Sequence, residues 1–423
     1  MPLYAFNSDV EVTSIYDLVN RDQVVIGTNG YVYGQDTLFQ GTANNRFVIA
    51  GTLASYAIPI VIGSPGTLGL NARINVTETG VISGYHAIAF YGAGLDLVNE
   101  GLIEGSEAAI RLENFGAAAL KSRIINTGTI FGDDYGILGT DDTIDALTVE
   151  NSGLIAARSV NKAIFLSDNA VANDVLINSG LIRGSVALGG GNDLYDGRGG
   201  GTVDGLIGGG AGNDTFRPGS AEERFDGGLG ADTLDFRGDL AVTIALDNSF
   251  EAEGMALGDT WVGIEHVIGS IRADRISGDG TANRLVGGGG IDTLAGGAGS
   301  DVLEGGAGKD ILAGGTGSDR FTLRDLAGAG DLVSDFSSSG VNGDDSIGIS
   351  TALGGGLSAG ALAATQFQLR ADNVAQDAND RFVFRTTDQT LWFDADGNGS
   401  AAAVMLFDLQ AGATMTAADI IIF

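Results

Sequence analysis

The chain has no cysteine, only 4 prolines and only 2 histidines among its 423 residues. The absence of cysteine excludes disulfides and thiolate metal sites. A secreted protein without disulfides needs another source of stability, and bound metal is one candidate. The scarcity of proline excludes collagen and proline-rich linkers. Two histidines far apart in the sequence argue against a histidine-rich metal site.

Basic residues and long apolar runs are also scarce. Lys and Arg number 22 against 54 Asp and Glu, a net charge of −32. This excess repels nucleic-acid phosphates and opposes compact folding unless cations neutralise it. No run of about 18 apolar residues is present to span a membrane. The start, MPLYAFNSD, shows no cleavable signal peptide, so we expect either a cytoplasmic protein or export that does not read the N-terminus.

Glycine, in contrast, is abundant. Its 70 residues are well over twice the usual share of about 7%. Aromatic residues make up 7% of the chain, so the core must be built from Ile, Leu, Val and Ala. The glycines fall into two kinds of repeat.

The first repeat has the pattern glycine, any residue, then Ile, Val or Leu. Its copies recur every 20–30 residues, a period typical of a solenoid, and suit the rungs of a parallel β-helix over residues 21–186. The recurrence of glycine and β-branched residues argues against helix. The copies are GYVYG at 30–34, GTLAS at 51–55, GVISG at 80–84, GLIEG at 101–105, GTIFG at 128–132, GLIAA at 153–157, GLIRG at 180–184 and GLIGG at 205–209.

Two further positions recur in these rungs. An asparagine lies two residues before the repeat glycine, and stacking would form a hydrogen-bonded ladder of Asn99, Asn126, Asn151 and Asn178. Each rung also has a run that alternates with period two. This alternation predicts an inner-facing stack of Ile88, Ile110, Ile137 and Ile164.

The second repeat is a nonapeptide with aspartate at its sixth place and an apolar residue at its eighth. A glycine-rich linker has no reason to keep that frame over 36 residues, so we interpret the repeat as a folded, ion-binding unit. The copies are GGAGNDTFR at 209–217, GGLGADTLD at 227–235, GGGGIDTLA at 287–295, GGAGSDVLE at 296–304, GGAGKDILA at 305–313 and GGTGSDRFT at 314–322, with a weaker LGGGNDLYD at 188–196 and a degenerate SGDGTANRL at 277–285 that has Asn283 in place of the aspartate.

The residue types in this repeat fit calcium. Glycines allow tight turns with positive φ that expose backbone carbonyls, and the aspartate adds a hard carboxylate. Calcium takes six to eight such oxygens at about 2.3–2.6 Å. The eighth place supplies a thin core through Leu294, Leu303, Leu312 and Phe321. Two nonapeptides would make one turn of a roll, with several Ca²⁺ ions between successive turns.

With these motifs the chain resembles the repeats-in-toxin (RTX) calcium-binding proteins. The resemblance implies a parallel β-roll, secretion through a type I channel and folding on meeting calcium outside the cell. The carboxylate ligands that it implies are Asp193, Asp214, Asp232, Asp292, Asp301, Asp310 and Asp319. The carbonyl ligands that it implies, at the first and third places, are Gly209, Ala211, Gly227, Leu229, Gly287, Gly289, Gly296, Ala298, Gly305, Ala307, Gly314 and Thr316.

The end of the chain resembles the C-terminal type I secretion domain of serralysin-type RTX proteins. Asp419 and the apolar residues 420–423 match the ending of that domain. The loop DADGNG at 394–399 is similar to an EF-hand, but Met405 stands where the EF-hand needs glutamate, so we expect a turn with one weak Ca²⁺ at most.

We therefore expect an all-β protein in which a β-helix-like solenoid continues into an RTX β-roll and a β-rich secretion domain. The expected segments are a cap or arm at 1–20, β-helix-like repeats at 21–186, a first RTX block at 187–236, a strand insert at 237–276, a second RTX roll at 277–322 and a secretion domain at 323–423.

The β-helix-like repeats raise the question of a catalytic site. β-Helices often host polysaccharide lyases and epimerases, which need a base, an acid and a group that neutralises the substrate carboxylate. The best local candidates are Asp133, Asp134 and Tyr135, with Lys121 or Arg123 nearby on a rung. The zinc-protease signature HExxH is absent, and His86 and His266 lie in apolar runs typical of packed residues.

We favour a non-enzymatic, secreted calcium-binding protein of the cell surface or extracellular matrix, S-layer-like or adhesive. Its expected partners are calcium, the type I secretion machinery, and either other copies of itself or a surface polysaccharide. A β-helix lyase or epimerase with an RTX tail is the alternative.

Overall fold

The computed structural model describes residues 2–63, 69–113, 121–140, 146–158, 162–167, 172–338 and 344–423. The chain forms two compact units, unit 1 (residues 1–232 and 258–263) and unit 2 (residues 233–257 and 264–423). The fold is all-β, as expected. The only helical elements in the described residues are four 3-10 turns: η1 (Leu326–Gly328), η2 (Thr351–Leu353), η3 (Ala364–Gln366) and η4 (Ala417–Asp419). No helix of the described chain is long and apolar enough to cross a membrane.

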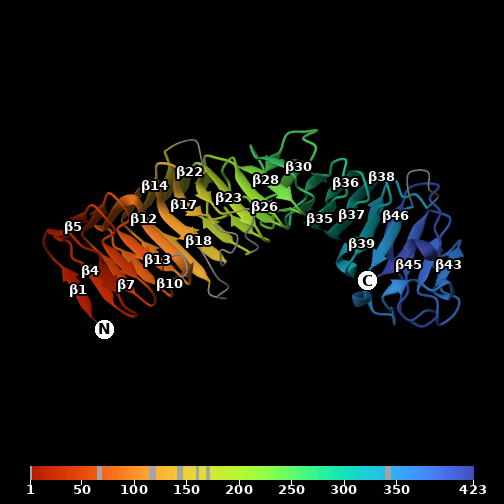
Figure 1. The fold of residues 1–423 in the computed structure, drawn as a ribbon. Helices are drawn as coiled ribbons and strands as arrows, with labels where there is room; N and C mark the ends of the chain where they lie inside the picture. The colour runs from red at the N-terminus through yellow and green to blue at the C-terminus, as the bar shows by residue number, and fades with distance from the viewer. Residues whose placement is uncertain are drawn as a thin grey trace. The chain divides into compact units, whose positions relative to one another are not determined.

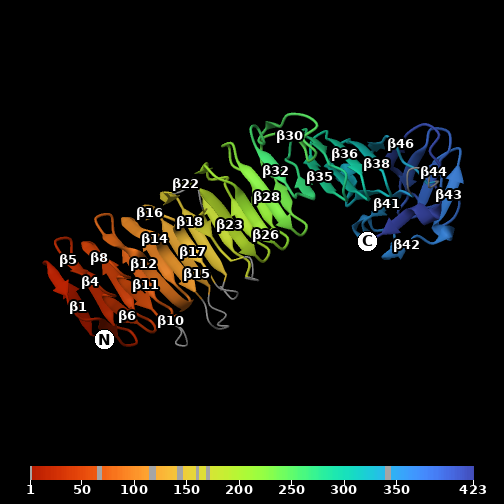
Figure 2. The same ribbon diagram turned by 45° about the horizontal axis from the view of Figure 1, so that its top comes forward.

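Unit 1 is a parallel β-helix whose rungs stack strand on strand (Figures 1 and 2). Three faces run along the stack, and each is a parallel sheet. The first face consists of β1 (Leu3–Phe6), β4 (Gln23–Ile26), β7 (Arg46–Ile49), β11 (Arg73–Val76), β13 (Asp96–Asn99), β15 (Ser122–Asn126), β18 (Leu147–Asn151), β21 (Val175–Asn178), β24 (Leu194–Asp196) and β27 (Thr215–Arg217).

The second and third faces meet in two long, bent strands that serve both: β12 (Val81–Ala93) and β14 (Leu102–Glu113). The second face also contains β2 (Val10–Val12), β5 (Tyr31–Gly34), β8 (Thr52–Ser55), β16 (Thr129–Gly132), β19 (Leu154–Ala157), β22 (Leu181–Arg183) and β25 (Thr202–Val203). The third face also contains β3 (Tyr16–Leu18), β6 (Phe39–Gly41), β9 (Ile60–Ile62), β10 (Gly69–Leu70), β17 (Tyr135–Gly139), β20 (Lys162–Phe165), β23 (Ser185–Gly190), β26 (Ile207–Ala211), β28 (Arg224–Leu229) and β32 (Thr260–Val262).

The core of unit 1 is a column of aliphatic side chains. The predicted stack of Ile88, Ile110, Ile137 and Ile164 is confirmed, because each pairs with the next in register and all are buried. Period-two alternation places every second side chain of a strand inside, and branched residues fill that surface well.

The predicted asparagine ladder is also confirmed. The Nδ2 of Asn99 donates to Oδ1 of Asn126 at 2.7 Å, and Asn126 donates to Asn151 and Asn151 to Asn178 at 2.8 Å. The four side chains are buried, so the ladder satisfies polar groups that water cannot reach.

Unit 2 is a parallel β-roll of two sheets whose strands recur every 18 residues in its regular part. One sheet contains β29 (Thr233–Asp235), β33 (His266–Ile268), β35 (Arg284–Gly289), β37 (Val302–Ala307), β39 (Arg320–Leu323), β41 (Ser346–Ile349), β47 (Ile420–Ile422) and the antiparallel β42 (Gly360–Ala361). The other contains β30 (Val242–Ala245), β31 (Glu253–Gly254), β34 (Arg275–Ser277), β36 (Thr293–Ala298), β38 (Ile311–Thr316), β40 (Asp331–Val333), β43 (Phe367–Arg370), β44 (Phe382–Arg385), β45 (Thr390–Phe393) and β46 (Val404–Leu409).

The thin core of the roll comes from the eighth place of each nonapeptide. Leu294, Leu303, Leu312 and Phe321 are buried between the two sheets of unit 2. One apolar side chain per strand is little hydrophobic surface for a stable core, so the turns of the roll must contribute to its stability.

Candidate calcium-binding turns

The sixth-place aspartates lie at the turns that lead into successive strands, and they form hydrogen-bonded ladders. In unit 1 the backbone N–H of Asp193 donates to Oδ1 of Asp214 at 2.8 Å, and that of Asp214 donates to Oδ1 of Asp232 at 2.7 Å. The same ladder extends backward, because the N–H of Asp174 donates to Asp193 and that of Leu147 to Asp174. We call this the unit 1 ladder.

Unit 2 carries two such ladders, one on each side of the roll. In the first, each backbone N–H donates to Oδ1 of the aspartate one turn further on, at 2.7–2.9 Å. The bonds run from Val242 to Asp274, from Asp274 to Asp292, from Asp292 to Asp310 and from Asp310 to Asp331. The second ladder follows the same rule at 2.8–2.9 Å. Its bonds run from the N–H of Asn283 to Asp301, from that of Asp301 to Asp319 and from that of Asp319 to Asp345. All predicted aspartate ligands thus occupy equivalent places.

Only one oxygen of most of these carboxylates is used inside the protein. The Oδ2 atoms of Asp292, Asp301, Asp310 and Asp319 are buried and accept no hydrogen bond within the described chain, and Asp193 and Asp214 repeat the pattern in unit 1. A buried acceptor without a partner costs about 1–3 kcal/mol, so a row of them indicates that something else neutralises it. A cation with oxygen ligands does so.

The first-place glycines pack directly against these oxygens. A Cβ added at Gly287, Gly296 or Gly305 would lie 2.3 Å from Oδ2 of the aspartate in the same nonapeptide. The glycine therefore leaves room at the carboxylate, and a larger residue would fill that space. The second- and fourth-place glycines have another role, since Gly306 and Gly308 have φ of 99° and 151°, values that L side chains rarely adopt.

The third-place carbonyls, predicted as ligands, already hold neighbouring turns together. The carbonyl of Leu229 accepts the N–H of Gly212 at 2.7 Å, that of Ala307 accepts Gly290 at 2.9 Å, and that of Thr316 accepts Gly299 at 2.8 Å. A carbonyl oxygen has a second lone pair, so these bonds leave it able to bind a cation. The assignment of the first- and third-place carbonyls as ligands stays a prediction.

Burial makes the negative charge of these aspartates costly. Burial, with a smaller contribution from neighbouring ladder aspartates, raises the pKa of Asp301 to about 6, of Asp292 to about 7 and of Asp193 to about 8. Burial likewise raises the pKa of Asp310 and Asp319. A bound divalent cation would hold these groups in the ionised form.

The donor set suits calcium better than a transition metal. Within the described residues, no three His, Cys, Asp or Glu side chains come close enough to form a side-chain metal cluster. A cation at these turns would therefore be held by single carboxylates together with backbone carbonyls, the hard oxygen ligands that calcium prefers. The residues present fit Ca²⁺.

Sequence analysis missed four members of the ladders: Asp174, Asp274, Asp331 and Asp345. Their surroundings lack the glycine frame, so no nonapeptide was recognised there. Each nevertheless precedes a buried apolar residue by two positions, namely Leu176, Ile276, Val333 and Ile347. That aspartate-to-apolar spacing was the signal that could have found them.

The other candidate residues have partners or surroundings of their own in the part of the chain that the structure describes. His86 is buried beside Arg111, whose Nη1 lies 3.2 Å from its Nε2, and burial lowers its pKa to about 4. Burial also lowers the pKa of His266, which is half-buried in β33. In the loop 394–399, the N–H of Asp396 donates to Oδ1 of Asp394 at 3.2 Å, so one carboxylate caps the turn itself.

The structure does not bring the candidate catalytic residues together. Asp133 forms an ion pair with Arg158, with Oδ1 2.9 Å from Nε. Arg123, on the first face, instead pairs with Glu150 at 2.8 Å. Asp419, predicted as part of the secretion signal, caps η4 by accepting the N–H of Thr416 at 2.7 Å.

Comparison with known families agrees with the geometry of the turns. Residues 206–234, 262–294 and 286–321 match the RTX calcium-binding nonapeptide repeat (4 copies). The chain therefore carries RTX calcium-binding repeats, and the matched stretches include Asp274 and Asn283 as well as the regular copies. No curated protein matches the chain.

Proposed function

We propose that this is a secreted structural protein of the cell surface or extracellular matrix, whose β-roll folds and assembles on binding several Ca²⁺ ions. The observation that carries the proposal is the row of buried Oδ2 atoms at the turns, which in the copies that begin with glycine lie against that first-place glycine. Such a row disfavours the metal-free fold and favours the calcium-loaded one.

Mass action couples folding to the calcium concentration, because calcium binding favours the folded chain. A cation that binds the folded turns but not the unfolded chain stabilises the fold in proportion to the logarithm of its concentration, at every site. Calcium is scarce inside cells and reaches millimolar levels outside, so the chain would stay unfolded during export and fold outside. A type I route and the C-terminal domain as its signal are part of the proposal.

The structural role is supported by what most of the chain does. The strands of unit 1 pair with their neighbours rung after rung, and the candidate catalytic residues Asp133 and Arg123 lie in separate surface ion pairs. Acidic residues in surface ion pairs are typical of solvated faces, whereas catalytic acids need a shared site.

The calcium part is tested by circular dichroism during calcium titration of the chelated protein. Asp301→Ala and Asp310→Ala should raise the calcium concentration at the folding midpoint, because each removes a ligand and a ladder acceptor. Asp133→Ala is the control and should leave the midpoint unchanged. Equal shifts for all three variants would contradict the assignment of the site.

The assembly part needs a separate measurement, light scattering on a sizing column during the same titration. We expect an expanded chain that becomes large, regular assemblies as calcium rises. A compact monomer at saturating calcium would overturn the structural role and leave calcium-coupled folding intact. Turnover of acidic polysaccharides by that monomer would favour the lyase or epimerase alternative.

A further inference from the structure

Exposed tyrosines gather on one edge of unit 1. The chain has 9 tyrosines, and the four that are exposed are Tyr31, Tyr33, Tyr56 and Tyr85, with Tyr56 81% exposed. Tyr33, Tyr56 and Tyr85 lie at or just after the ends of second-face strand segments, near where the chain turns toward the third face, and Tyr31 begins the strand that carries Tyr33. Exposed aromatic rings gathered in one place, in a protein with few aromatics, indicate a binding surface.

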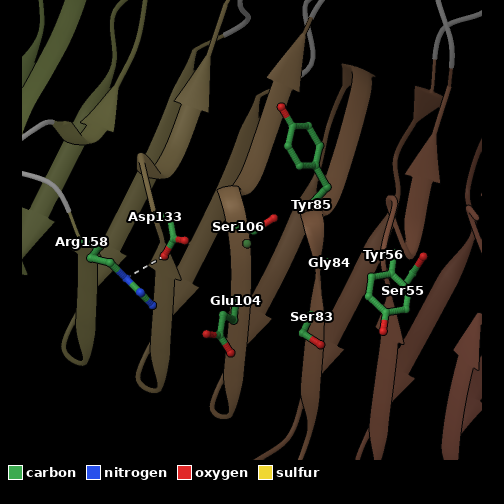
Figure 3. Close-up of a pocket in the computed structure, with 10 residues that line it drawn as sticks. Ser55, Tyr56, Ser83, Gly84, Tyr85, Glu104, Ser106, Asp133 and Arg158 are labelled. Carbon is green, nitrogen blue, oxygen red and sulfur yellow. Dashed lines mark ion pairs between the residues drawn. The ribbon is translucent and has the colours of Figure 1, made fainter. Parts of the chain in front are cut away.

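A groove runs along this edge. Two adjoining hollows of about 290 and 310 Å³ share Ser55, Tyr56 and Ser83 in their lining. Figure 3 shows Tyr56 and Tyr85 standing on neighbouring strands, with Ser83 and Glu104 below them and Asp133 and Arg158 at the far end.

Glycines form the bend that hollows the surface. A Cβ at Gly84 would lie 2.5 Å from Cδ of Pro59, and a Cβ at Gly105 would lie 2.0 Å from the carbonyl oxygen of Ala108. Only glycine fits where the second-face part of each strand bends sharply into the third-face part. The absence of side chains at these two positions leaves the floor of the groove open.

The rings follow the stacking direction of the rungs. Tyr33 pairs in register with Ala54, and Ala54 pairs with Ser83, so Tyr33, Tyr56 and Tyr85 come from three consecutive rungs. Neighbouring parallel strands lie about 4.8 Å apart. The groove therefore offers a track of rings that suits an extended, repetitive ligand better than a compact one.

Polar groups between the rings are available to a ligand. The hydroxyls of Ser83 and Ser106 and the carboxylate of Glu104 form no hydrogen bond or ion pair within the described chain. Glu11, Glu104 and Asp133 outnumber the single cation, Arg158, so the groove is acidic and disfavours an anionic ligand.

We propose that this groove binds a neutral polysaccharide. The C–H faces of sugar rings pack on aromatic rings, while the serine hydroxyls donate and accept hydrogen bonds and the carboxylates accept them from sugar hydroxyls. A lipid surface lacks these sugar hydroxyls, and the acidic lining repels an acidic polymer. The inference deepens the proposed surface role by naming a partner. It does not depend on the calcium turns, since the groove lies in rungs that carry no nonapeptide.

Affinity electrophoresis of the full chain in calcium tests the proposal. The gels contain mannan, dextran or a soluble β-glucan, with alginate as the acidic counter-probe. We expect at least one neutral polymer to retard the protein and alginate not to. Tyr56→Ala should weaken binding about tenfold, the loss typical of one aromatic anchor.

Matched variants keep the test sharp. Ile177→Ala removes an exposed apolar side chain on the first face of unit 1 and should bind as the wild type does. Tyr56→Phe keeps the ring and should retain most of the affinity. The exposed Tyr56 side chain makes misfolding of these variants easy to exclude by circular dichroism.

Four outcomes would overturn the proposal: no retardation by any neutral polymer, retardation by alginate alone, unchanged retardation after Tyr33→Ala combined with Tyr56→Ala, or concentration-dependent self-association that only the tyrosine variants abolish. The last would assign the groove to a second copy of the chain. None of these outcomes changes the calcium midpoint, so failure here is distinct from failure of the calcium proposal.

Discussion

At the scale of the residue, the first place of the nonapeptide requires glycine because a side chain there would collide with the aspartate carboxylate, and not because φ is positive. Gly305 has no positive φ, yet an added Cβ would lie 2.3 Å from Oδ2 of Asp310. The aspartate cannot move aside easily, because its Oδ1 holds the N–H of Asp292 at 2.8 Å.

Gly305→Ala should therefore destabilise the calcium-loaded roll by more than about 1 kcal/mol, the range for alanine where the site cannot accommodate it. The measurement is the free energy of unfolding from urea titration in saturating calcium. Gly280→Ala is the matched control, because a Cβ there would meet nothing within 4 Å. Equal losses in the two variants would contradict the steric role of the first place.

The two functions of a ladder aspartate can be separated at Asp310. Asparagine would keep an Oδ1 acceptor for the N–H of Asp292 but remove the buried charge. We expect Asp310→Asn to stabilise the metal-free fold relative to wild type and to weaken the response to calcium.

The measurement is thermal unfolding followed by circular dichroism, with chelator and with calcium. Asp310→Ala should instead destabilise both forms, since it removes the hydrogen bond as well. A metal-free Asp310→Asn variant that is as unstable as Asp310→Ala would contradict this separation, because the retained Oδ1 acceptor would then give no stability and removal of the charge no relief.

At the scale of the element, the asparagine ladder holds the rungs of unit 1 without an ion. Removing Asn126 would leave Nδ2 of Asn99 and Oδ1 of Asn151 buried without their ladder partners. Asn126→Ala should therefore cost about 1–3 kcal/mol or more. The cost should be the same with and without calcium, because no cation is involved.

Urea unfolding of unit 1 measures this loss. Arg123→Ala, on the same strand, is the control, since its surface pair with Glu150 should contribute less than about 1 kcal/mol. A loss at Asn126 that calcium restores would contradict an ion-independent ladder.

An element could be predicted from the sequence where its residues recur at a regular spacing in the repeats. The stack of Ile88 and Ile110 and the asparagine ladder followed from spacing alone, because stacked rungs bring equivalent positions together. Asp274 and Asp331 could not be found in this way: Asp274 has glycine only at the first place, and Asp331 has no glycine at the first, second or fourth place. The tyrosine groove was hidden for another reason. Tyr56 and Tyr85 each lie five residues after a repeat glycine, but Tyr33 lies only three after its own and pairs in register with Ala54, so no single spacing marks all three.

At the scale of the whole molecule, the ladders predict an unusual response to pH. Burial raises the pKa of Asp301 to about 6, of Asp292 to about 7 and of Asp331 to about 8, whereas an unfolded aspartate titrates near 3.9. A carboxyl group with a raised folded pKa stabilises the fold fully below its unfolded pKa, and this stability is lost as the pH rises through the folded value.

In chelator, the protein should therefore melt at a higher temperature at pH 5 than at pH 8. Calcium should weaken or reverse the trend, because it stabilises the ionised form. Repeating the scans in 1 M KCl separates the ladders from the general repulsion of a chain with a net charge of −32, since salt screens exposed charges and barely affects buried ones. Stability that falls on acidification in chelator would contradict the ladder.

One rung of unit 1 belongs to both kinds of ladder. Asn178 accepts from Asn151 at the end of β21, and Asp174, just before that strand, donates its N–H to Asp193. The part of the β-helix that is held by the asparagine ladder thus ends in a preformed strand. The first calcium-binding turn can add its strand to this one by parallel pairing. Growth from such a template avoids the costly first step of nucleating a parallel sheet, because each added turn closes only a short loop. The β-helix would then act as an intramolecular seed for the calcium-binding turns of unit 1.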